Sequence, residues 1–470
     1  MSDQAQGVLN LCRFLAVNCS DTIVAPATPP GEGGLAVVRL SGPESLAAVR
    51  SFFRPSGHVR ELVSHHLYHG FLVDSTGRNV DEVMVVYMQP PRSYTCEEVV
   101  EVQCHGGQQI VRAILDLFLS HGLRLAQPGE FTYRAFMNGR LDLAQAEAVA
   151  RLIHSRSDAA RALALSQVEG RLSRAIHLFT EKLRRELVLV EAWIDFPEED
   201  IPTQDTTRIK SQISEIIKEV SVLLDTFETG RVFVEGASIL LIGRPNAGKS
   251  SLLNALLGED RAIVTDIPGT TRDLLEEGLT IGGIPVRLID TAGFRASVDP
   301  VELEGVRRAS DKIHSADLVL LLVDGSRPCH QEDLLAYQAC ADVDTILVAT
   351  KSDLGRAELD PSLAKMHRID VSAKTGEGLD LLRQAVARNF AADGTELGES
   401  VVITEKRHND ALLKCRESLR RVAASLESRA SLEFLSLDLR DALDSLSSIS
   451  GEISTEDILG DIFSNFCIGK

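Results

Sequence analysis

The strongest chemical signal in the chain is a glycine-rich stretch, GRPNAGKS at residues 243–250, which fits the pattern GxxxxGK followed by Ser or Thr. An apolar run precedes it at 238–242 and a helical pattern follows at 252–257, the order that a phosphate-binding loop requires. Glycines let backbone N–H groups face phosphates, and the N-terminus of the following helix adds positive potential. We expect Lys249 to reach the β- and γ-phosphates of a nucleotide and the Ser250 hydroxyl to bind Mg²⁺.

Three shorter segments, each directly after a predicted strand, indicate which nucleotide binds. In DTAG at 290–293, the carboxylate can enter the Mg²⁺ shell and the glycine amide can meet the γ-phosphate. In TKSD at 350–353, the carboxylate can accept both N–H groups of guanine. SAK at 372–374 is suited to cover the base. Each segment alone is weak, but in this order they predict GTP rather than ATP.

The chain departs from Ras-like enzymes where those enzymes orient the attacking water. Phe294 follows the DTAG segment at the position of the Ras-like Gln, and a phenyl ring cannot orient water. Arg272 and Arg295 lie in the flanking switch segments, but neither can be assigned as an arginine finger. Another group must therefore orient the water and supply positive charge.

The elements that must position these residues lie in regions with three different sequence patterns. Residues 236 to about 393 alternate β-rich runs with helical patterns, which predicts a parallel sheet with crossover helices. Residues 141–230 and 408–448 are rich in Ala, Leu, Arg and Glu, and Pro197 and Pro202 divide the first of these helical blocks. The α/β domain is therefore predicted to be inserted into a helical domain.

Residues 21 to about 137 mix strand and helix signals. Short β-rich runs occur at 35–40 and 83–88, and residues 98–102 alternate with period two, as a half-buried strand does. An apolar-periodic helix is predicted over 110–119. This segment is predicted to form a small α+β domain.

Length and composition agree with a multidomain protein. The chain has 470 residues, with 49 basic and 68 acidic side chains and a net charge of −19. The length predicts about two to four domains, and the charge argues against a surface that coats nucleic acid or membrane as a whole. The eight cysteines show no metal-ligand spacing. Without an apolar run near the ~20 residues of a membrane span, we expect a cytoplasmic protein that does not contact the membrane.

Six motifs give the chain a specific resemblance. They are DTIVA at 21–25, TPPG at 28–31, QPGEF at 127–131, LDLAQAE at 141–147, TDIPGTTRD at 265–273 and CIGK at 467–470. In combination they resemble the MnmE (TrmE) family of tRNA-modification GTPases over residues 21–470. Residues 1–20 form an extension before the family's usual start, and its role is open.

The resemblance implies a four-segment domain plan. Residues 1–137 would form an α+β folate-binding and dimerisation domain, and residues 138–235 the first part of a helical domain. Residues 236–393 would form an inserted G domain with the Ras-like P-loop GTPase fold. Residues 394–470 would complete the helical domain and carry the terminal CIGK motif.

The resemblance also supplies the missing catalytic groups. It implies a K⁺ ion in place of the finger, with Asn246, Thr265, Ile267 and Thr270 as ligands. Thr271 would join Ser250 on Mg²⁺, and Glu302 would orient the water. The full set expected to bind GTP is Asn246, Ala247, Gly248, Lys249, Ser250, Ser251, Thr265, Asp266, Ile267, Pro268, Gly269, Thr270, Thr271, Asp290, Thr291, Ala292, Gly293, Thr350, Lys351, Ser352, Asp353, Ser372, Ala373 and Lys374.

A folate site is implied in the same way, with Arg39, Glu101, Arg140 and Lys470 as its residues. A carboxylate can read a pterin and basic groups can bind a glutamate tail, so these residue types suit a tetrahydrofolate derivative, 5-formyl- or methylene-tetrahydrofolate. Cys467 lies in the terminal motif and is the second candidate catalytic residue beside Glu302. Whether Cys467 acts as a nucleophile or as a structural residue stays open.

The chain departs from the family pattern at three positions. Thr350 stands where guanine sites usually carry Asn, whose amide braces the P-loop and touches the base, so weaker guanine affinity is expected. Cys96 and Cys104 stand where relatives often have Gly, on either side of Glu101. Their effect on the backbone near the folate site is an open question.

Two functions from different classes follow. The first is a homodimeric GTPase that, with the FAD-dependent partner MnmG, modifies carbon five of the tRNA wobble uridine. The alternative is a GTPase switch that scaffolds RNA or ribosome assembly without modification chemistry. The folate residues and the CIGK tail favour the first. Basic clusters at 140–185 and 406–421 are candidate contacts for tRNA.

Overall fold

A computed structural model describes most of the chain. The described residues are 21–155, 157–195, 203–259, 279–281, 284–290, 313–358, 360–363, 366–390, 401–428, 430–453, 455–464, 466–467 and 469. The chain divides into two compact units. The first comprises residues 1–150, 168–182 and 443–470, and the second comprises residues 151–167 and 183–442.

The first unit is built on a seven-stranded sheet with the order β3-β4-β5-β6-β2-β1-β7. Its strands are β1 (Ile23–Pro26), β2 (Gly33–Ser41), β3 (Phe53–Pro55), β4 (Leu67–Val73), β5 (Asn79–Met88), β6 (Val99–Gly106) and β7 (Arg124–Leu125). Neighbours pair antiparallel except β1 and β7, which are parallel. The strands expected at 35–40, 83–88 and 98–102 are therefore confirmed.

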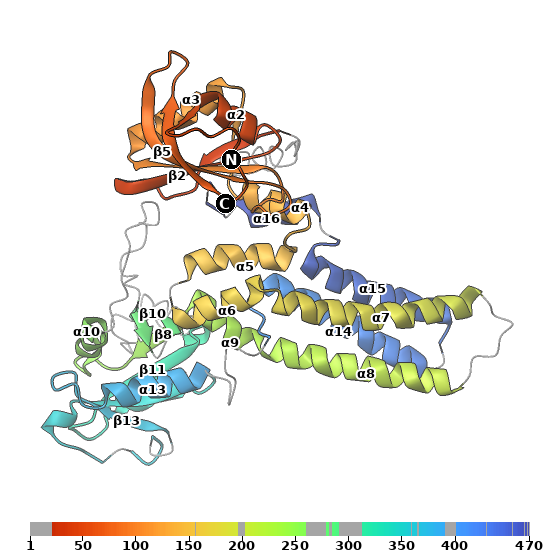
Figure 1. The fold of residues 1–470 in the computed structure, drawn as a ribbon. Helices are drawn as coiled ribbons and strands as arrows, with labels where there is room; N and C mark the ends of the chain where they lie inside the picture. The colour runs from red at the N-terminus through yellow and green to blue at the C-terminus, as the bar shows by residue number, and fades with distance from the viewer. Residues whose placement is uncertain are drawn as a thin grey trace, which may run out of the picture. The chain divides into compact units, whose positions relative to one another are not determined.

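Helices α2 (Ser45–Phe52) and α3 (Gln108–Ser120) pack on this sheet (Figure 1). Val100, Val102 and Cys104 of β6 point into the shared core, whereas Glu101 between them is half-buried on the opposite face. This period of two places charged residues of β2 and β6 on the side of the sheet that the helices leave open. The predicted α+β domain is confirmed.

In the described part of the chain, the first unit also contains α4 (Glu130–Met137), α16 (Glu456–Ser464), the first parts of α5 (Leu143–His154) and α7 (Arg171–Asp195), and the last part of α15 (Leu432–Ser450). Phe463 of α16 is fully buried against Leu143 and lies 5.3 Å from the ring of Tyr133, centroid to centroid. Gly451 has φ +86°, and a Cβ there would lie 2.9 Å from the Leu143 side chain. The C-terminal segment is thus part of the core of this unit.

The second unit contains a six-stranded sheet with the order β13-β12-β11-β8-β10-β9. Its strands are β8 (Ala237–Ile242), β9 (Leu279–Ile281), β10 (Ile284–Asp290), β11 (Leu318–Asp324), β12 (Thr345–Thr350) and β13 (Arg368–Val371). All neighbours are parallel except β9, which pairs antiparallel with β10. The expected α/β domain is confirmed, with one antiparallel edge strand that the sequence did not reveal.

Helices cover both faces of this sheet, so its central strands are apolar throughout. Ile239 and Leu241 of β8 pack with α10 (Lys249–Glu259) and α13 (Leu379–Phe390). Leu240 and Ile242 of the same strand pack on the other face, where α12 (Gln331–Ala339) contributes Ala336. Every residue of β11 is buried.

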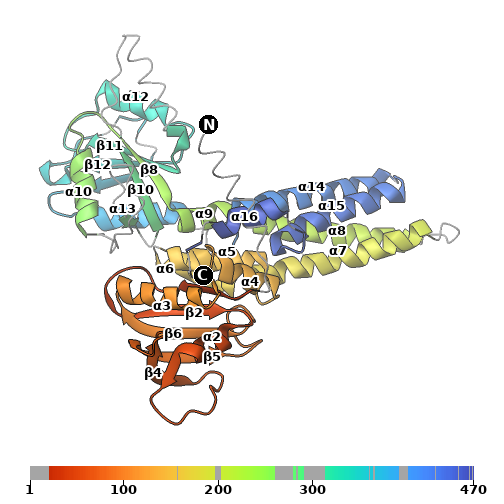
Figure 2. The same cartoon turned by 90° about the horizontal axis from the view of Figure 1, so that it is seen from above.

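The second unit also contains α6 (Asp158–Val168), the second part of α7 (Arg171–Asp195), α8 (Thr203–Asp225), α9 (Phe227–Glu235), α14 (Lys406–Ser428) and the first part of α15 (Leu432–Ser450). Helices α8 and α14 run side by side in both views (Figures 1 and 2). Ile209, Ile213 and Ile216 recur along one buried face of α8, as amphipathic packing requires. The predicted block 408–448 thus contains two helices.

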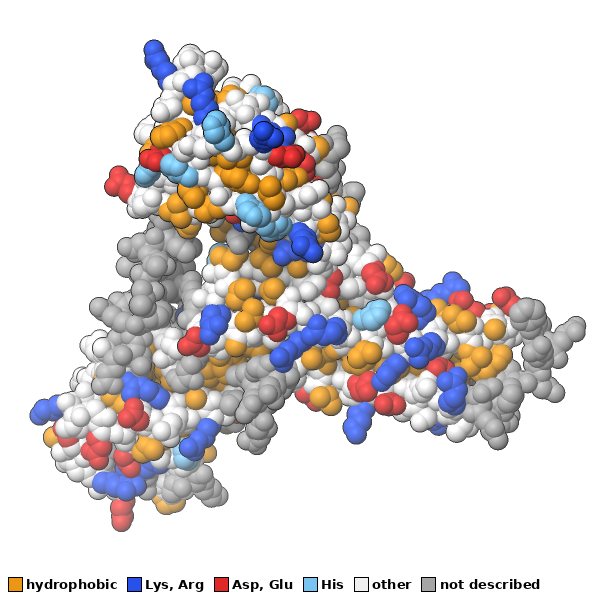
Figure 3. All heavy atoms as spheres, viewed as in Figure 1, with side chains coloured by type: hydrophobic (Ala, Val, Ile, Leu, Met, Phe, Trp, Pro, Cys, Tyr) orange, Lys and Arg blue, Asp and Glu red, His pale blue; other side chains and the backbone are white. Residues whose placement is uncertain are grey.

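Charges of both signs alternate over these helices on the face that Figure 3 shows. Arg421 donates to Asp438 at 2.7 Å and to Asp441 at 3.3 Å, so this member of the basic cluster at 406–421 is engaged within the protein. Arg420 makes a looser pair with Glu417 at 3.8 Å. Among the described residues, no helix combines the length and apolarity needed to cross a membrane.

Candidate functional sites

The predicted nucleotide-binding segments meet at one edge of the second unit's sheet. The parallel register aligns Asp290 with Leu241, Leu321 with Ile242, and Thr350 with both Asp324 and Val371. The carboxyl ends of β8, β10, β11, β12 and β13 therefore lie together, as ligand sites in open parallel sheets require. The glycine-rich loop, Asp290 and the segments at 350–353 and 372–374 all leave the sheet at this edge.

The glycine-rich loop takes its shape from backbone conformation. Asn246 and Gly248 both adopt left-handed angles, with φ +65° and +93°. Gly243 packs so tightly on β11 that a Cβ would lie 2.4 Å from the Leu322 carbonyl oxygen. Helix α10 begins at Lys249, whose Nζ donates to the Gly243 carbonyl and, at 3.1 Å, to that of Arg244. The Lys249 side chain therefore bonds back to the backbone of the loop that precedes it.

Three residues that are expected to bind cations or phosphates are exposed in the loop and at the start of α10. Asn246, Ser250 and Ser251 are exposed, whereas Ala247 is fully buried. Ser250 and Ser251 lie in the first turn of α10, where backbone N–H groups are unpaired within the helix. This arrangement can bind an anion and leaves the Ser250 hydroxyl accessible to a metal.

Thr350 corrects one expectation from the sequence. Its hydroxyl donates to the carbonyl oxygens of Ala247 at 2.6 Å and Val323 at 3.0 Å, in a position that is 5% exposed. A Cβ at Gly248 would lie 3.3 Å from the Thr350 Oγ1. The expectation that Thr in place of Asn removes the brace on the P-loop is wrong, because the hydroxyl bonds the loop directly.

Two side-chain pairs order the segments expected to recognise the base. Lys351 adopts φ +62° and donates to Asp324 at 2.8 Å. Burial would raise the pKa of Asp324, but the bonds from Lys351 and Ser326 outweigh it and lower this pKa to about 2. Ser372 is fully buried and donates to Asp353 at 2.7 Å, which joins the two segments. Ser352 belongs to a short 3₁₀ turn, and Ala373 and Lys374 follow Ser372 in a turn.

Part of the predicted nucleotide site lies outside the described residues. These residues are Thr265, Asp266, Ile267, Pro268, Gly269, Thr270, Thr271, Thr291, Ala292, Gly293 and Glu302. Asp290 is described only as the last residue of β10. Arg272, Phe294 and Arg295 also lie outside the described residues.

The residues expected to bind folate gather around one aromatic ring in the first unit. Arg39 and Glu101 face each other across β2 and β6, with an N–H···O distance of 2.8 Å. The guanidinium carbon of Arg39 lies 5.4 Å from the ring centroid of Tyr94, and that of Arg140 lies 4.8 Å away. Arg140 also donates to the Tyr94 carbonyl oxygen at 2.7 Å. The sequence did not single out Tyr94.

The C-terminal tail reaches the same residues. Arg39 contacts the Gly469 carbonyl oxygen at 3.5 Å, and the Cys467 carbonyl oxygen accepts from the Gly129 N–H at 3.5 Å. Gly469 has φ +95°, and a Cβ there would lie 2.1 Å from the Pro26 carbonyl oxygen. The Cys467 side chain is exposed. Lys470 lies outside the described residues.

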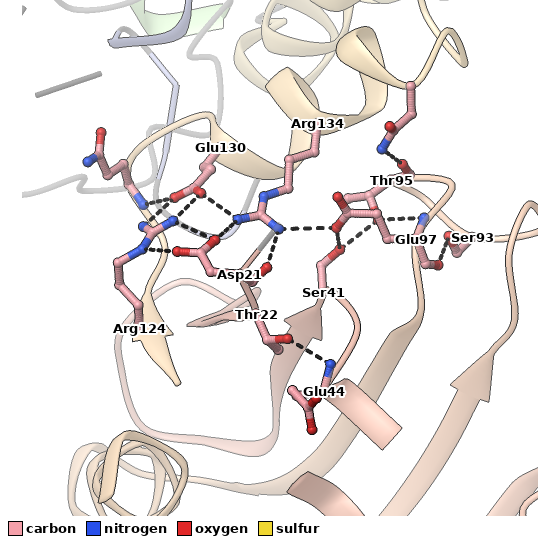
Figure 4. Close-up of polar contacts among 12 residues, drawn as sticks. Asp21, Thr22, Ser41, Glu44, Ser93, Thr95, Glu97, Arg124, Glu130 and Arg134 are labelled. Carbon is pink, nitrogen blue, oxygen red and sulfur yellow. Dashed lines mark hydrogen bonds and ion pairs between the residues drawn. The ribbon is translucent and has the colours of Figure 1, made fainter. Parts of the chain in front are cut away.

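A network of buried ion pairs adjoins this site (Figure 4). Arg134 and Glu130 on α4 are both fully buried, and Arg134 donates to Glu130 at 3.0 Å, Asp21 at 2.6 Å and Glu97 at 3.2 Å. Arg124 donates to Asp21 at 2.8 Å and to Glu130 at 2.7 Å. Burial would raise the pKa of Asp21 and Glu130, but the arginine hydrogen bonds outweigh it and lower both pKa values.

The network fixes the loop that carries Tyr94. Ser41 donates to Glu97 at 2.7 Å and shares a hydrogen bond with Thr95 at 2.6 Å. Asn138, beyond the end of α4, donates to the Thr95 carbonyl oxygen at 2.7 Å. The Tyr94 hydroxyl meets the Thr132 hydroxyl at 2.9 Å. Both ends of the tyrosine are therefore held by groups that the ion pairs position.

The two unusual cysteines have different local reasons. Cys96 adopts φ +60°, a conformation that glycine takes more readily, so the position explains why a relative would carry Gly. Cys104 is buried in the sheet core, and burial raises the pKa of its thiol to about 11. Glu101 keeps its pairing with Arg39 between them.

Comparison with known proteins identifies the family. Residues 22–140 match the model described as GTP-binding protein TrmE N-terminus, and residues 143–467 match the MnmE helical domain. The chain is 51% identical over 452 residues to a tRNA modification GTPase MnmE of Syntrophotalea carbinolica, covering 96% of this chain and 99% of that relative.

The chain belongs to the MnmE family of tRNA modification GTPases. Relatives from Geobacter metallireducens and Aquifex aeolicus, both named tRNA modification GTPase MnmE, are each 46% identical over 453 residues and 96% of this chain. They are covered over 99% and 100% of their own lengths. As an MnmE family member, the chain is a GTP-hydrolysing enzyme of tRNA modification.

Solved structures of other proteins are similar to part of this chain. The G domain of the Thermotoga maritima FeoB iron transporter is 28% identical, with a TM-score of 0.26, and covers 33% of this chain and 99% of its own. An Aquifex aeolicus Era variant bound to GDP and aluminium fluoride is 24% identical, with a TM-score of 0.26, covering 39% and 66%. The P-loop GTPase fold of the second unit's sheet is supported by its own strand order and loop geometry.

Proposed function

We propose that this MnmE family member hydrolyses GTP with the help of K⁺ and acts with the FAD-dependent protein MnmG. Together they would carry out folate-dependent modification at carbon five of the tRNA wobble uridine, of the aminomethyl or carboxymethylaminomethyl type. One observation carries the proposal. The same chain holds two sites. In one, a loop with the geometry of a phosphate-binding loop lies beside the segment at 350–353 that is expected to bind guanine. In the other, arginines surround the Tyr94 ring and contact the C-terminal tail.

The residues of the nucleotide site fit the cations that the family implies. Ser250 offers an exposed hydroxyl at the start of α10, and we propose that it binds Mg²⁺ with Thr271. Asn246 offers an exposed amide, and we propose that it binds K⁺ with Thr265, Ile267 and Thr270. When bound, these cations supply positive charge near the phosphates. The loop's N–H groups and Lys249 orient the phosphates, and we assign Glu302 to orient water.

GTP turnover in K⁺ and in Na⁺ at equal ionic strength tests the cation assignment. We expect turnover to rise in K⁺ alone, because Na⁺ is the smaller ion and would not reach all of the oxygen ligands proposed for K⁺ at once. The Glu302→Ala variant should keep GTP affinity and lose turnover. Equal rates in both salts would contradict the K⁺ assignment, and unchanged turnover in the variant would contradict the role of Glu302.

The residues around Tyr94 fit a tetrahydrofolate derivative. Arg39, Glu101 and Arg140 combine basic and acidic groups beside an aromatic face, which suits a heterocycle with an anionic tail. We propose that these residues and Lys470 bind the cofactor, which supplies the one-carbon unit. Cys467 is proposed as the second catalytic residue because its exposed side chain lies in the tail that contacts Arg39 through Gly469.

The family membership also supports a proposal for the assembly and the domain limits. We propose a cytoplasmic homodimer formed through residues 1–137, which joins MnmG and binds tRNA. The helical domain would comprise residues 138–235 and 394–470, with the G domain inserted as residues 236–393. Light scattering of the full chain should give the mass of a dimer, and the mass of a monomer at micromolar concentration would contradict this assembly.

A further inference from the structure

Thr350 occupies the space directly beneath the P-loop. It is the last residue of β12 and is 5% exposed, with its methyl and hydroxyl groups both within 3.5 Å of where a Cβ of Gly248 would lie. Its Oγ1 is 2.6 Å from the Ala247 carbonyl oxygen and 3.0 Å from that of Val323. The side chain therefore touches the loop on one side and β11 on the other.

The hydrogen count at this position decides what Thr350 can do. A hydroxyl has one hydrogen, and both neighbouring groups are carbonyl oxygens that only accept. That hydrogen is therefore committed to the protein backbone, between Ala247 and Val323. An amide at the same position would have two hydrogens, one for the loop and one for a ligand. Thr350 has no donor left for a base.

We infer that Thr350 braces the P-loop from within the protein and leaves the five-membered-ring edge of guanine unread, so that base selection depends on Asp353. The ring nitrogen at position seven of guanine is an acceptor and can only be read by a donor. Asp353 is an acceptor and suits the opposite edge, which carries the ring N–H and the exocyclic amine. The inference rests on the proposed GTP binding and adds which base edge is recognised.

Asp353 is well placed for this role. The Ser372 hydroxyl donates to its Oδ1 at 2.7 Å, and Ser372 in turn accepts from the Lys374 and Thr375 N–H groups at 3.3 and 3.2 Å. This chain of hydrogen bonds orients the carboxylate and leaves its second oxygen, and further lone pairs, available to a ligand. The segment that begins with Thr350 thus also holds the acceptor that the inference requires.

Binding of modified nucleotides to the full-length chain tests the inference. Fluorescent GDP can be displaced by GDP, by 7-deaza-GDP, in which a C–H group replaces the ring nitrogen, and by IDP, which lacks the exocyclic amine. We expect 7-deaza-GDP to bind within about twofold of GDP. IDP should bind at least about tenfold more weakly, because the Asp353 carboxylate loses one of the two N–H donors on that edge of the base. A tenfold loss for 7-deaza-GDP would overturn the inference.

Variants separate the brace from the base contact. Thr350→Asn should create discrimination against 7-deaza-GDP of about threefold to tenfold, the worth of one hydrogen bond. Thr350→Val should weaken GDP and 7-deaza-GDP equally, by about fivefold to thirtyfold, because the Ala247 carbonyl oxygen of the loop loses the hydroxyl that holds it. Thr350→Ser should restore the affinity. If Thr350→Val binds as the unmodified protein does, the hydroxyl does not brace the loop.

Thr345→Val provides the matched control. Thr345 opens the same strand, and its hydroxyl donates to the Val343 carbonyl oxygen at 2.8 Å, at the opposite end of β12 from the P-loop. This variant should leave all three affinities unchanged. A chain that binds no guanine nucleotide would contradict the proposed function. Binding of GDP with strong discrimination at position seven would contradict this inference alone.

Discussion

The two candidate sites of this chain are held together by different means. The shape of the nucleotide site is set mainly by backbone conformation. Two loop residues adopt left-handed angles, and Gly243 packs closely on β11. The site around Tyr94 is held in place mainly by buried charges, because Arg134 and Glu130 are fully buried and Arg134 joins α4 to Asp21, just before β1, and to Glu97 of the Tyr94 loop. The first site should therefore be sensitive to steric changes, and the second to loss of charge.

The largest expected effect is at the buried charges. Arg134→Met should lower the free energy of unfolding of the first unit by about 3–5 kcal/mol, because three carboxylates lose a partner that is 0% exposed. Urea denaturation followed by circular dichroism measures the change. Arg112→Met is the control, since Arg112 pairs with Asp116 at 3.9 Å on the surface and should matter little. A loss equal in both variants would break the comparison.

At the nucleotide site the largest effect should fall on turnover instead of stability. Lys249→Ala should reduce GTP turnover by about 100- to 1000-fold, the effect of removing one charged donor from a phosphate site. Urea denaturation should be nearly unchanged, because the Lys249 ammonium donates to the Gly243 and Arg244 carbonyl oxygens within its own loop. Folate affinity should also be unchanged. A destabilisation as large as that of Arg134→Met would contradict the division between the sites.

A methyl group should be enough to disturb the loop. Gly248→Ala places a Cβ at φ +93° and 3.3 Å from Thr350, so we expect a cost of about 1–2 kcal/mol in nucleotide binding. Titration of fluorescent GDP measures it. Gly258→Ala is the control because the space around Gly258 in α10 is open, and this variant should be neutral or slightly stabilising. Equal affinities of the two variants would count against backbone control of the loop.

A smaller effect should appear with pH. Asp21 and Glu130 have pKa values below their ordinary 3.8 and 4.5, because the arginine hydrogen bonds outweigh burial. Their contribution to stability is present above those ordinary values and is lost as pH falls through the lowered ones. Urea midpoints from pH 7 to pH 3 should therefore drop most steeply below about pH 4. The Glu130→Gln variant should flatten that part of the curve, and a parallel curve would contradict this assignment.

The smallest expected effect is a difference in the alkylation rates of the cysteine thiols. Cys467 is exposed, whereas burial raises the pKa of Cys104 and Cys340 to about 11 and that of Cys415 to about 12. Iodoacetamide at pH 8 should therefore alkylate Cys467 much faster than these three, as measured on each peptide by mass spectrometry. Equal labelling of Cys467 and Cys104 would mean that the C-terminal tail is covered in solution.

The sequence predicted the nucleotide site better than the site around Tyr94, and the reason is physical. Phosphate recognition uses consecutive backbone groups, so its motif is contiguous in the chain and visible at 243–250. The ion pairs of the other site join residues far apart, such as Arg134 and Asp21, which are 113 positions apart. Such pairing depends on the strand order of the folded domain, which no local pattern reveals.

Thr350 shows the same limit within a motif. The residue type indicated that an amide was missing, and this led to the expectation of a lost brace. The hydroxyl reaches the Ala247 carbonyl oxygen because β12 ends directly beneath the loop. A distance of 2.6 Å could not be inferred from residue types. Tyr94 was missed for a similar reason, since its neighbours Arg39 and Arg140 come from distant positions.

The central claim is that both sites serve one reaction, and nucleoside analysis of tRNA tests it most directly. The chain would be incubated with MnmG, tRNA, GTP and a tetrahydrofolate derivative, and the wobble uridine examined by mass spectrometry. We predict that the modified nucleoside forms with the unmodified chain and fails to form with either Lys249→Ala or Arg39→Ala. GTP hydrolysis at full rate without any modified nucleoside would contradict the account and favour a GTPase that only scaffolds RNA assembly.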